Sequence, residues 1–166
     1  MINRRSFLTV AVAATALPFV RQFTNAPALA ADSKASFRYA LSDAEWKKKL
    51  SPQAYQVLRH EATERPYTSP LNAEKRPGTF LCAGCDLPLF SSQTKFESGT
   101  GWPSFYRPLK DAVGTTTDYK LGFPRTEVHC AQCGGHLGHV FEDGPKPTGL
   151  RYCMNGLALK FAPAKA

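Results

Sequence analysis

Two stretches decide the fold of this chain, Cys82-Ala83-Gly84-Cys85 and Cys130-Ala131-Gln132-Cys133-Gly134. Each follows a predicted strand and has a glycine inside the pair or directly after it. Glycine permits the left-handed backbone that lets two thiolates converge on one ion. Two such pairs supply four sulfur ligands, which complete a tetrahedral zinc shell with no open position. The sequence therefore predicts one structural Zn²⁺ that joins two distant segments and helps a small domain to fold.

Two other interpretations of these cysteine pairs stay open. The pairs could form disulfides in an exported protein, or one of them could be a thioredoxin-like redox motif. The redox motif expects a helix that starts at its first cysteine, whereas strands precede both pairs and no helical pattern follows them. Two matched pairs in a chain of 166 residues favour zinc.

Proline and glycine residues separate short apolar or alternating runs in the second part of the chain, which is typical of an antiparallel β domain. The candidate strands are residues 78–82, 87–90, 125–130, 140–142, 150–154 and 157–161. Two short helices precede them. The first begins at a capping box formed by Ser42 and Glu45, and the second begins at Ser51-Pro52 and ends near His60. Length and a hydrophobic fraction of 43% predict one mainly β domain over residues 42–166.

The first thirty residues differ from the rest and have the parts of an export signal. The charged start Arg4-Arg5 precedes an apolar stretch from Leu8 to Val20, and Ala28-Leu29-Ala30 follows as a small-residue cleavage site. The apolar stretch is shorter than the about 20 residues that a membrane-spanning helix needs. We therefore predict a signal peptide over residues 1–30, a short tail over residues 31–41 and no permanent membrane anchor.

The paired arginines of this signal resemble the twin-arginine signal of bacteria, which is an address that a receptor reads. That resemblance implies export in the folded state. A protein that took up its metal in the cytoplasm would keep its Cys-x-x-Cys pairs from closing into disulfides in an oxidising compartment. We expect export to the bacterial periplasm by this route, and a plain Sec-type signal stays the alternative.

The charge of the chain gives no support to nucleic acid as a partner. Residues 1–30 hold three of the 21 basic residues and none of the 13 acidic ones, so the net charge falls from +8 to +5 without them. The one basic run, Lys47-Lys48-Lys49, lies in an expected helix, where a solvated face explains it. A nucleic-acid surface needs clustered basic residues with interleaved aromatic ones, and the sequence has no such cluster.

Cys153 is the fifth cysteine and stands outside both pairs, in Arg151-Tyr152-Cys153-Met154-Asn155. On a strand, the side chains of Arg151, Cys153 and Asn155 would share one face. A neighbouring cation increases the thiolate fraction of a thiol, and the thiolate is the reactive form. The alternative is a small buried hydrophobic residue, which the polar neighbours disfavour.

Two further segments add side chains suited to chemistry. His136 and His139 lie in Gly135-His136-Leu137-Gly138-His139-Val140-Phe141 and can exchange protons near neutral pH. Extra metal ligands or surface residues are the alternatives for these histidines. Trp102 lies between Gly101 and Pro103 on a loop, where its indole could form the wall of a small apolar pocket instead of packing in the core.

Taken together, these motifs resemble the B-type methionine sulfoxide reductases from about Ser42 to Phe161. The matching segments, in order, are Cys82-x-x-Cys85 and residues 98–105, 125–128, 130–133, 135–141, 143–145 and 147–153. The resemblance implies two antiparallel sheets in a small zinc-clamped domain shaped like a barrel or a tent. It also implies reduction of the R epimer of methionine sulfoxide, either free or, more usually, in oxidised proteins.

The resemblance also assigns roles to single residues. Cys153 would attack the sulfoxide sulfur and become a sulfenic acid, and Trp102 would receive the substrate methyl group. The residues expected to bind and protonate the sulfoxide oxygen and to activate the thiol are His136, His139, Asn155 and Arg151. The electrons would come from an external, thioredoxin-like thiol reductant. A monomer is the default expectation, since the sequence says little about oligomeric state.

Two positions depart from the family pattern. Many members carry a resolving cysteine where this chain has Thr100, and the chain has no sixth cysteine. If all four paired cysteines bind zinc, a sulfenic acid on Cys153 must be reduced from outside the chain. Asn155-Gly156 replaces the common Asn-Ser, which affects only a secondary hydrogen bond.

Two competing functions remain at this stage. A zinc-clamped module of similar fold could bind a protein partner without any chemistry, although such a module would not need Cys153 and its polar neighbours. A different thiol enzyme on the same scaffold could process glutathione adducts, which the loop around Trp102 disfavours.

Overall fold

The computed structural model describes residues 37–165. The predicted signal over residues 1–30 lies outside this part. Within it, no helix is both long enough and apolar enough to cross a membrane. The prediction of two short helices is confirmed by α1 (Asp43–Lys49) and α2 (Pro52–His60).

Both helices begin as the sequence predicts. The side chain of Glu45 accepts a hydrogen bond from the Ser42 backbone at 2.8 Å, and the Ser42 hydroxyl accepts one from the Glu45 backbone at 3.4 Å. Ser51 caps α2 in the same way by accepting from the backbone N–H of Ala54 at 3.2 Å. Such caps satisfy backbone groups at the helix start that have no partner within the helix.

The strands form two antiparallel sheets, so the prediction of a mainly β fold with two sheets is confirmed. The smaller sheet has the order β2-β1-β9, and the larger one has the order β3-β4-β8-β7-β6-β5. The strand bounds are β1 (Gly78–Cys82), β2 (Pro88–Ser91), β3 (Lys95–Phe96), β4 (Ser104–Phe105), β5 (Val113–Asp118), β6 (Arg125–Cys130), β7 (His136–Phe141), β8 (Arg151–Met154) and β9 (Leu159–Pro163). In the described residues each sheet keeps two edge strands, so the expected barrel is wrong and the sheets are open.

Some expected strands differ from those observed. The strand expected over residues 140–142 begins earlier, at His136, because β7 pairs with β6 from His136 to Val140 and with β8 from Gly138 to Phe141. The strand expected over residues 157–161 is shifted, because Gly156–Ala158 forms a 3₁₀ turn before β9. β5 was not predicted, since its Gly-Thr-Thr-Thr core is polar and largely exposed.

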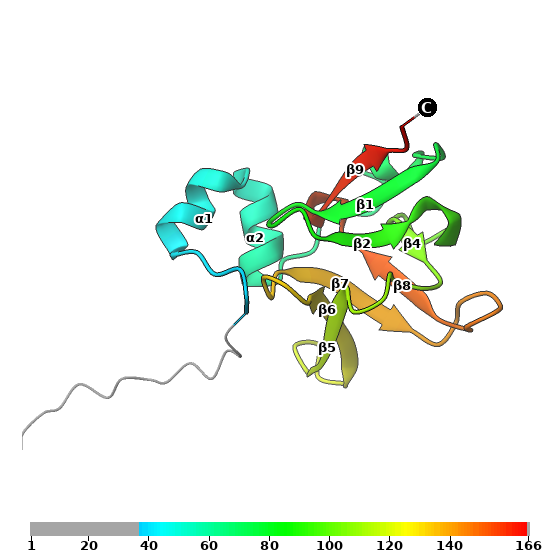
Figure 1. Ribbon diagram of the computed structural model, residues 1–166. Helices are drawn as coiled ribbons and strands as arrows, with labels where there is room; N and C mark the ends of the chain where they lie inside the picture. The colour runs from blue at the N-terminus through cyan, green and yellow to red at the C-terminus, as the bar shows by residue number, and fades with distance from the viewer. Residues whose placement is uncertain (1–36, 166) are drawn as a thin grey trace, which may run out of the picture. The chain divides into compact units, whose positions relative to one another are not determined.

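Aromatic side chains form the core between the two sheets. Phe80 of β1, Phe90 of β2 and Phe105 of β4 are completely buried. Phe90 stacks on Phe105 with ring centroids 4.3 Å apart, and Phe80 meets Phe105 edge-on at 4.9 Å. These contacts join the faces of the two sheets. Figure 1 shows α1 and α2 to one side of both sheets.

Candidate active site and zinc site

The two cysteine pairs form matching turns. Asp86 and Gly134, each directly after the second cysteine of its pair, donate to the carbonyls of Cys82 and Cys130, both at 2.9 Å. Both residues are left-handed, with φ of 61° at Asp86 and 66° at Gly134. The expected role of glycine therefore holds at Gly134 but is wrong for the first pair, where an aspartate takes the left-handed position, as aspartate tolerates.

The four thiols converge on one point. The sulfur atoms of Cys82, Cys85, Cys130 and Cys133 lie within 4.8 Å of one another. The shortest separations join the two pairs, 3.7 Å between Cys82 and Cys133 and 3.5 Å between Cys85 and Cys130. A tetrahedral Zn²⁺ with bonds of about 2.3 Å has sulfur atoms about 3.8 Å apart, whereas a disulfide needs about 2 Å. All four thiols are free, so the cluster fits zinc and not disulfides.

This zinc site connects the two sheets. Cys82 ends β1 of the smaller sheet, and Cys130 ends β6 of the larger one. Arg59 of α2 donates to the Cys133 carbonyl at 3.3 Å and lies over the Trp46 ring of α1 at 5.0 Å. A metal at this point therefore fixes both sheets and both helices, which is a structural role.

Cys153 lies in a row of polar side chains across the larger sheet. In register, Cys153 of β8 faces His139 of β7 on one side and Ser104 of β4 on the other. His139 in turn faces Glu127 of β6. Because residues directly opposite each other on paired strands point to the same face, these four side chains share one side of the sheet. This arrangement sets Cys153 beside an imidazole and a carboxylate.

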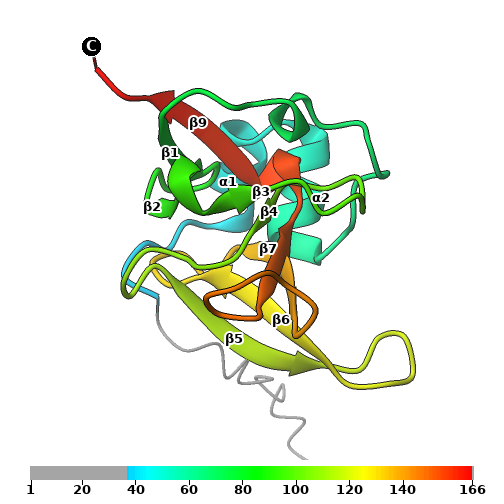
Figure 2. The ribbon, with the colours of Figure 1, turned by 90° about the vertical axis from the view of Figure 1, so that its right-hand side faces the viewer.

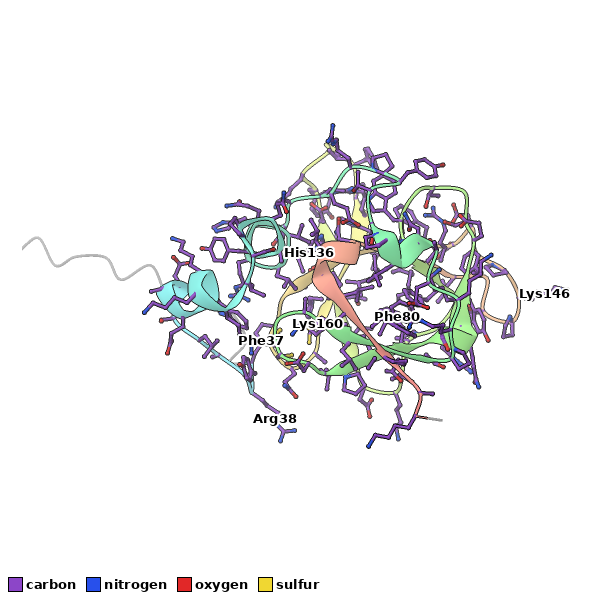
Figure 3. All side chains as sticks on the ribbon, turned by 90° about the horizontal axis from the view of Figure 1, so that it is seen from above. Phe37, Arg38, Phe80, His136, Lys146 and Lys160 are labelled. Carbon is purple, nitrogen blue, oxygen red and sulfur yellow. The ribbon has the colours of Figure 1, made fainter. Side chains whose placement is uncertain are left out.

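A β-bulge brings the second histidine to the same face. His136 and His139 are three residues apart, so a regular strand would place them on opposite faces. The pairing slips between Val128 and His129, which leaves Leu137 as the extra residue of β7. The bulge re-aims the side chain before it. The two imidazole rings consequently lie 5.4 Å apart, and Figure 3 shows His136 in the interior of the fold.

Glu127 holds His136 from the next strand. The Glu127 carboxylate lies 2.8 Å from Nδ1 of His136 and 3.0 Å from Nδ1 of His129, and it accepts from Thr116 at 2.9 Å. Burial raises the pKa of Glu127, but the hydrogen bonds from the two histidines and Thr116 outweigh this and hold it at about 2. Since an ionised carboxylate only accepts, Nδ1 of His136 carries a proton. Nε2 of His136 is buried and has no partner among the described residues.

Asp118 holds His139 by the other ring nitrogen. Its carboxylate lies 2.8 Å from Nε2 of His139 and also accepts from Arg125. Burial lowers the pKa of His139, and the hydrogen bond to Asp118 opposes this shift only in part. Burial thus favours the neutral ring of His139, and the bond to Asp118 places its proton on Nε2. The two histidines thus offer different ring nitrogens to the site.

A chain of hydroxyl groups borders the Cys153 thiol. Thr100 Oγ1 lies 3.7 Å from Cys153 Sγ, and Ser98 Oγ lies 2.8 Å from Thr100 Oγ1. Ser98 also contacts Ser104 at 2.7 Å, so these hydroxyl groups connect to the row of polar side chains that contains Cys153. Thr100 is therefore in direct contact with Cys153.

Trp102 is anchored through Glu64 and Asn155. The indole N–H of Trp102 donates to the Glu64 carbonyl at 3.1 Å, and the Glu64 backbone N–H donates to the Asn155 side chain at 3.0 Å. Asn155 donates to the Leu137 carbonyl at 3.1 Å. The buried Glu64 carboxylate, whose pKa burial raises, accepts from the backbone of Gly156 and Leu157. This network ties the Trp102 loop to the segment just after Cys153.

Of the two polar residues near Cys153 in the sequence, Arg151 lies on the same strand and Asn155 lies beyond its end. Arg151 lies on β8 two residues before Cys153, forms a two-pronged pair with Asp143 at 2.8 Å for each bond, and stacks over Phe141 at 4.4 Å. The pair with Asp143 raises the pKa of Arg151, and the neighbouring Cys153 adds to this shift. Asn155 lies past the end of β8, so the expected shared strand face includes only Arg151 and Cys153. Both polar groups of the Asn155 amide contact the backbone.

Sequence reasoning gave no role to Glu127, Asp118 or Glu64. Asp118 contacts His139 21 residues along the chain, and Glu64 contacts Gly156 92 residues along it, so spacing along the sequence gave no signal for either. Glu127 contacts His136 across the pairing of β6 and β7, which the sequence did not predict. Glu127 offered one clue, because it lies on a strand that ends in a zinc ligand and alternates with Arg125 and His129. An acid on the inner face of a strand needs a partner.

A closed four-thiol metal site and a separate thiol beside two carboxylate-bound histidines define a class, the zinc-containing thiol enzymes of mainly β fold. Comparison with known proteins agrees with this class. The family model described as the SelR domain matches residues 50–163. The chain therefore belongs to the SelR domain family.

Several relatives carry the name peptide methionine sulfoxide reductase. A protein named "Peptide methionine sulfoxide reductase MsrB" from Pseudomonas putida is 60% identical over 120 residues, which cover 72% of this chain and 90% of that protein. One of the same name from Leptospira interrogans is 55% identical over 121 residues, 72% of this chain and 92% of that protein. "Peptide methionine sulfoxide reductase B1, chloroplastic" from Arabidopsis thaliana is 54% identical over 122 residues, 73% of this chain and 60% of that protein.

Proposed function

We propose that Cys153 of this chain reduces the R epimer of methionine sulfoxide in oxidised proteins through a sulfenic acid. Family membership makes the chain a peptide-methionine (R)-S-oxide reductase, an oxidoreductase that acts on methionine sulfoxide with a thiol reductant. The observation that carries the assignment of Cys153 is its place in the polar row of the larger sheet. It is the one cysteine of the chain outside the zinc cluster, and it faces His139 across the pairing of β7 and β8.

The proposed first step transfers oxygen from one sulfur to the other. Cys153 Sγ, as a thiolate, attacks the sulfoxide sulfur, and the sulfur–oxygen bond breaks as the oxygen moves to Sγ. The substrate sulfur is reduced to the thioether of methionine, and Cys153 is oxidised to the sulfenic acid. The proton that leaves the thiol ends on the transferred oxygen, so the step needs no other reactant.

The second step restores the thiol from outside the chain. A dithiol reductant attacks the sulfenic sulfur, water leaves, and a mixed disulfide forms. The second thiol of the reductant then attacks this disulfide, releases Cys153 and leaves the reductant oxidised. Thr100 occupies the place of a resolving cysteine and cannot form a disulfide, which supports direct reduction by an external, thioredoxin-like thiol.

The two histidines would carry the proton between sulfur and oxygen. Nε2 of His136 is buried and has no partner within residues 37–165, and Glu127 keeps the proton of this ring on Nδ1. Nε2 is therefore free to accept the thiol proton and return it to the oxygen, where negative charge develops. Arg151 would add a positive charge on the strand face of Cys153, and Trp102 would form the wall that receives the substrate methyl group.

We further propose that the enzyme works outside the cytoplasm. The arginine pair and the apolar stretch of residues 1–30 support a twin-arginine export signal, and a metal site filled before export would protect the four zinc ligands from oxidation. Oxidised exported proteins would then be the substrates. Fractionation of bacteria that express the full-length chain tests this, since the processed protein should appear in the periplasm and Arg4→Lys combined with Arg5→Lys should keep it inside.

The activity itself is tested with purified full-length chain, dithiothreitol and the separate epimers of a methionine sulfoxide substrate. We expect consumption of the R epimer only, and no consumption by Cys153→Ser. Dimedone, which labels sulfenic acids, should modify Cys153 after a single turnover without reductant. Activity that survives in Cys153→Ser would refute the mechanism.

A further inference from the structure

Exposed large apolar side chains in the described part of the chain gather on two loops. Three of them, Tyr119, Leu121 and Phe123, lie within five residues at the turn between β5 and β6 and are 67%, 61% and 55% exposed. We call these three residues the apolar tip. The fourth, Tyr67, is 70% exposed. Scattered exposed apolar residues are ordinary on a soluble protein, whereas a concentrated group marks a site of interaction.

The apolar tip is continuous with the Cys153 site. Asp118, the last residue of β5, precedes Tyr119 directly and holds Nε2 of His139 at 2.8 Å. His139 faces Cys153 across the pairing of β7 and β8. Figure 2 shows the turn between β5 and β6 reaching beyond the rest of the larger sheet. A substrate that enters the site therefore has the tip at one end of the row that contains Cys153.

Tyr67 lies at the opposite end of that row. Its backbone N–H donates to the Gly101 carbonyl at 2.7 Å, and its hydroxyl donates to the Gly99 carbonyl at 2.6 Å. These bonds fix Tyr67 on the loop that carries Thr100 and Trp102. In the order of the larger sheet, this loop joins β3 and β4, whereas the tip joins β5 and β6, so β8 with Cys153 lies between the two.

One short segment of the chain limits the distance between Tyr67 and the tip. Glu61 forms an ion pair with Lys120 of the tip turn at 2.5 Å, and Tyr67 follows Glu61 by six residues. Six residues span at most about 20 Å. Across the sheet, β5 and β8 are three strand spacings apart, about 14 Å. An extended polypeptide rises about 3.3 Å per residue, so about four residues cover the distance between β8 and β5.

We propose that the apolar tip and Tyr67 form a docking surface for the polypeptide on both sides of an oxidised methionine. The partner is an extended segment of a protein substrate with an apolar residue about four positions from the methionine sulfoxide on the side of the tip and another apolar residue on the side of Tyr67. Apolar flanks fit because methionine is usually buried among other apolar residues and becomes accessible with them when a protein loosens. This inference rests on the proposed function and adds that the apolar tip and Tyr67 favour sulfoxides with apolar flanking residues.

The test compares three substrates with the full-length chain and dithiothreitol. They are N-acetyl-methionine (R)-sulfoxide, a peptide of about ten residues with apolar flanks around the sulfoxide, and the same peptide with serine and glycine flanks. One variant combines Tyr119→Ser, Leu121→Ser and Phe123→Ser. The matched control is Lys120→Ser, which changes the same turn without removing an apolar side chain.

We expect the combined variant to lower kcat/KM for the apolar peptide, relative to the acetylated amino acid, by about tenfold, mainly through KM. The preference for apolar over polar flanks should fall with it, and Lys120→Ser should keep both ratios. An unchanged ratio, or an equal loss on all three substrates, overturns the docking surface. If the unaltered chain fails to reduce the acetylated R epimer, the proposed function itself is wrong.

Discussion

The zinc cluster and the Cys153 site both use cysteine thiols, but the surroundings of the thiols differ. Each thiol of the cluster has three other thiols within 4.8 Å, which leaves a bound metal no position for substrate. Cys153 is partly exposed, its Sγ lies 3.7 Å from Thr100 Oγ1, and its neighbours can move or hold a proton. The comparison teaches that saturation by ligands makes a thiol structural, and that proton donors together with access make one reactive.

The largest expected effect comes from opening the zinc shell. Cys130→Ser removes one of four ligands, and we expect loss of the metal and of the cooperative fold. Structural zinc contributes about 10–16 kcal/mol in small domains, as much as the whole stability of about 5–15 kcal/mol. Zinc content by elemental analysis and thermal unfolding by circular dichroism measure both losses.

Cys153→Ser is the matched control, because it changes the same side chain outside the cluster. It should keep its zinc and its melting temperature. A Cys130→Ser chain that loses zinc yet melts like the unaltered protein would show that the cluster is not structural, and the contrast between the two sites would fail.

The cysteine pattern shows which features sequence can predict. Local signals were sufficient for the capping box at Ser42, the helix start at Ser51 and the two strands that end in Cys82 and Cys130. Each depends on residues a few positions apart, so spacing carries the information. The separation of four structural thiols from Cys153 followed from the same spacing, and the sulfur positions agree with it.

The features that sequence did not predict depend on pairing between distant strands. The bulge at Leu137 puts His136 and His139 on one face, although their spacing alone argues for opposite faces. The partners Glu127 and Asp118 come from strands whose register no local pattern fixes. β5 was missed because its exposed threonines lack the apolar alternation of a buried strand. Open sheet edges replaced the expected barrel for the same reason, since closure depends on register.

The second largest effect is expected from removing the carboxylate that binds His136. Glu127→Gln removes the buried carboxylate, and we expect the free energy of unfolding at pH 7 to fall by about 3 kcal/mol and kcat/KM to fall about tenfold. The folded pKa of Glu127 is about 2, below its ordinary value of 4.5. Its stabilising contribution is therefore complete above pH 4.5 and is lost as the pH falls through about 2.

Urea unfolding of both chains at a series of pH values measures this difference directly. The difference in the free energy of unfolding between the unaltered chain and Glu127→Gln should become smaller below pH 4.5. Protonation of the zinc ligands affects both chains alike and cancels in the comparison. Glu142→Gln, at an exposed carboxylate just after β7, is the control and should show no gap. A gap that stays constant down to low pH would mean that the charge of Glu127 contributes nothing.

A smaller effect is expected for the cation beside the reactive thiol. Arg151→Lys keeps the charge but loses the two-pronged pair with Asp143 and the stacking on Phe141, so kcat/KM should fall about fivefold. Asp143→Asn weakens the same pair from the other side and should cause a similar loss. The pH dependence of Cys153 alkylation distinguishes the orientation of the Arg151 side chain from its charge. Because Arg151→Lys keeps the positive charge, it should not change this pH dependence. Full activity of Arg151→Lys would show that the two-pronged pair of Arg151 with Asp143 is not needed for catalysis.

The smallest change in rate, and the sharpest test of the comparison, is expected for Thr100→Cys. Thr100 Oγ1 already contacts Cys153 Sγ, and Ser98 holds the loop in place, so a second thiol at this position lies within reach of the sulfenic acid. We expect the rate of the first oxygen transfer to change less than about twofold, because attack on the sulfoxide precedes any resolution.

The product should differ completely: a disulfide between positions 100 and 153 should replace the dimedone-reactive sulfenic acid of the unaltered chain. Peptide mapping after a single turnover without reductant distinguishes the two products, and Thr100→Ser, which keeps a hydroxyl, should still give the sulfenic acid. If Thr100→Cys instead draws a zinc ligand into the disulfide, the two thiol sites are not independent, because exchange between them requires the cluster to open within one catalytic cycle.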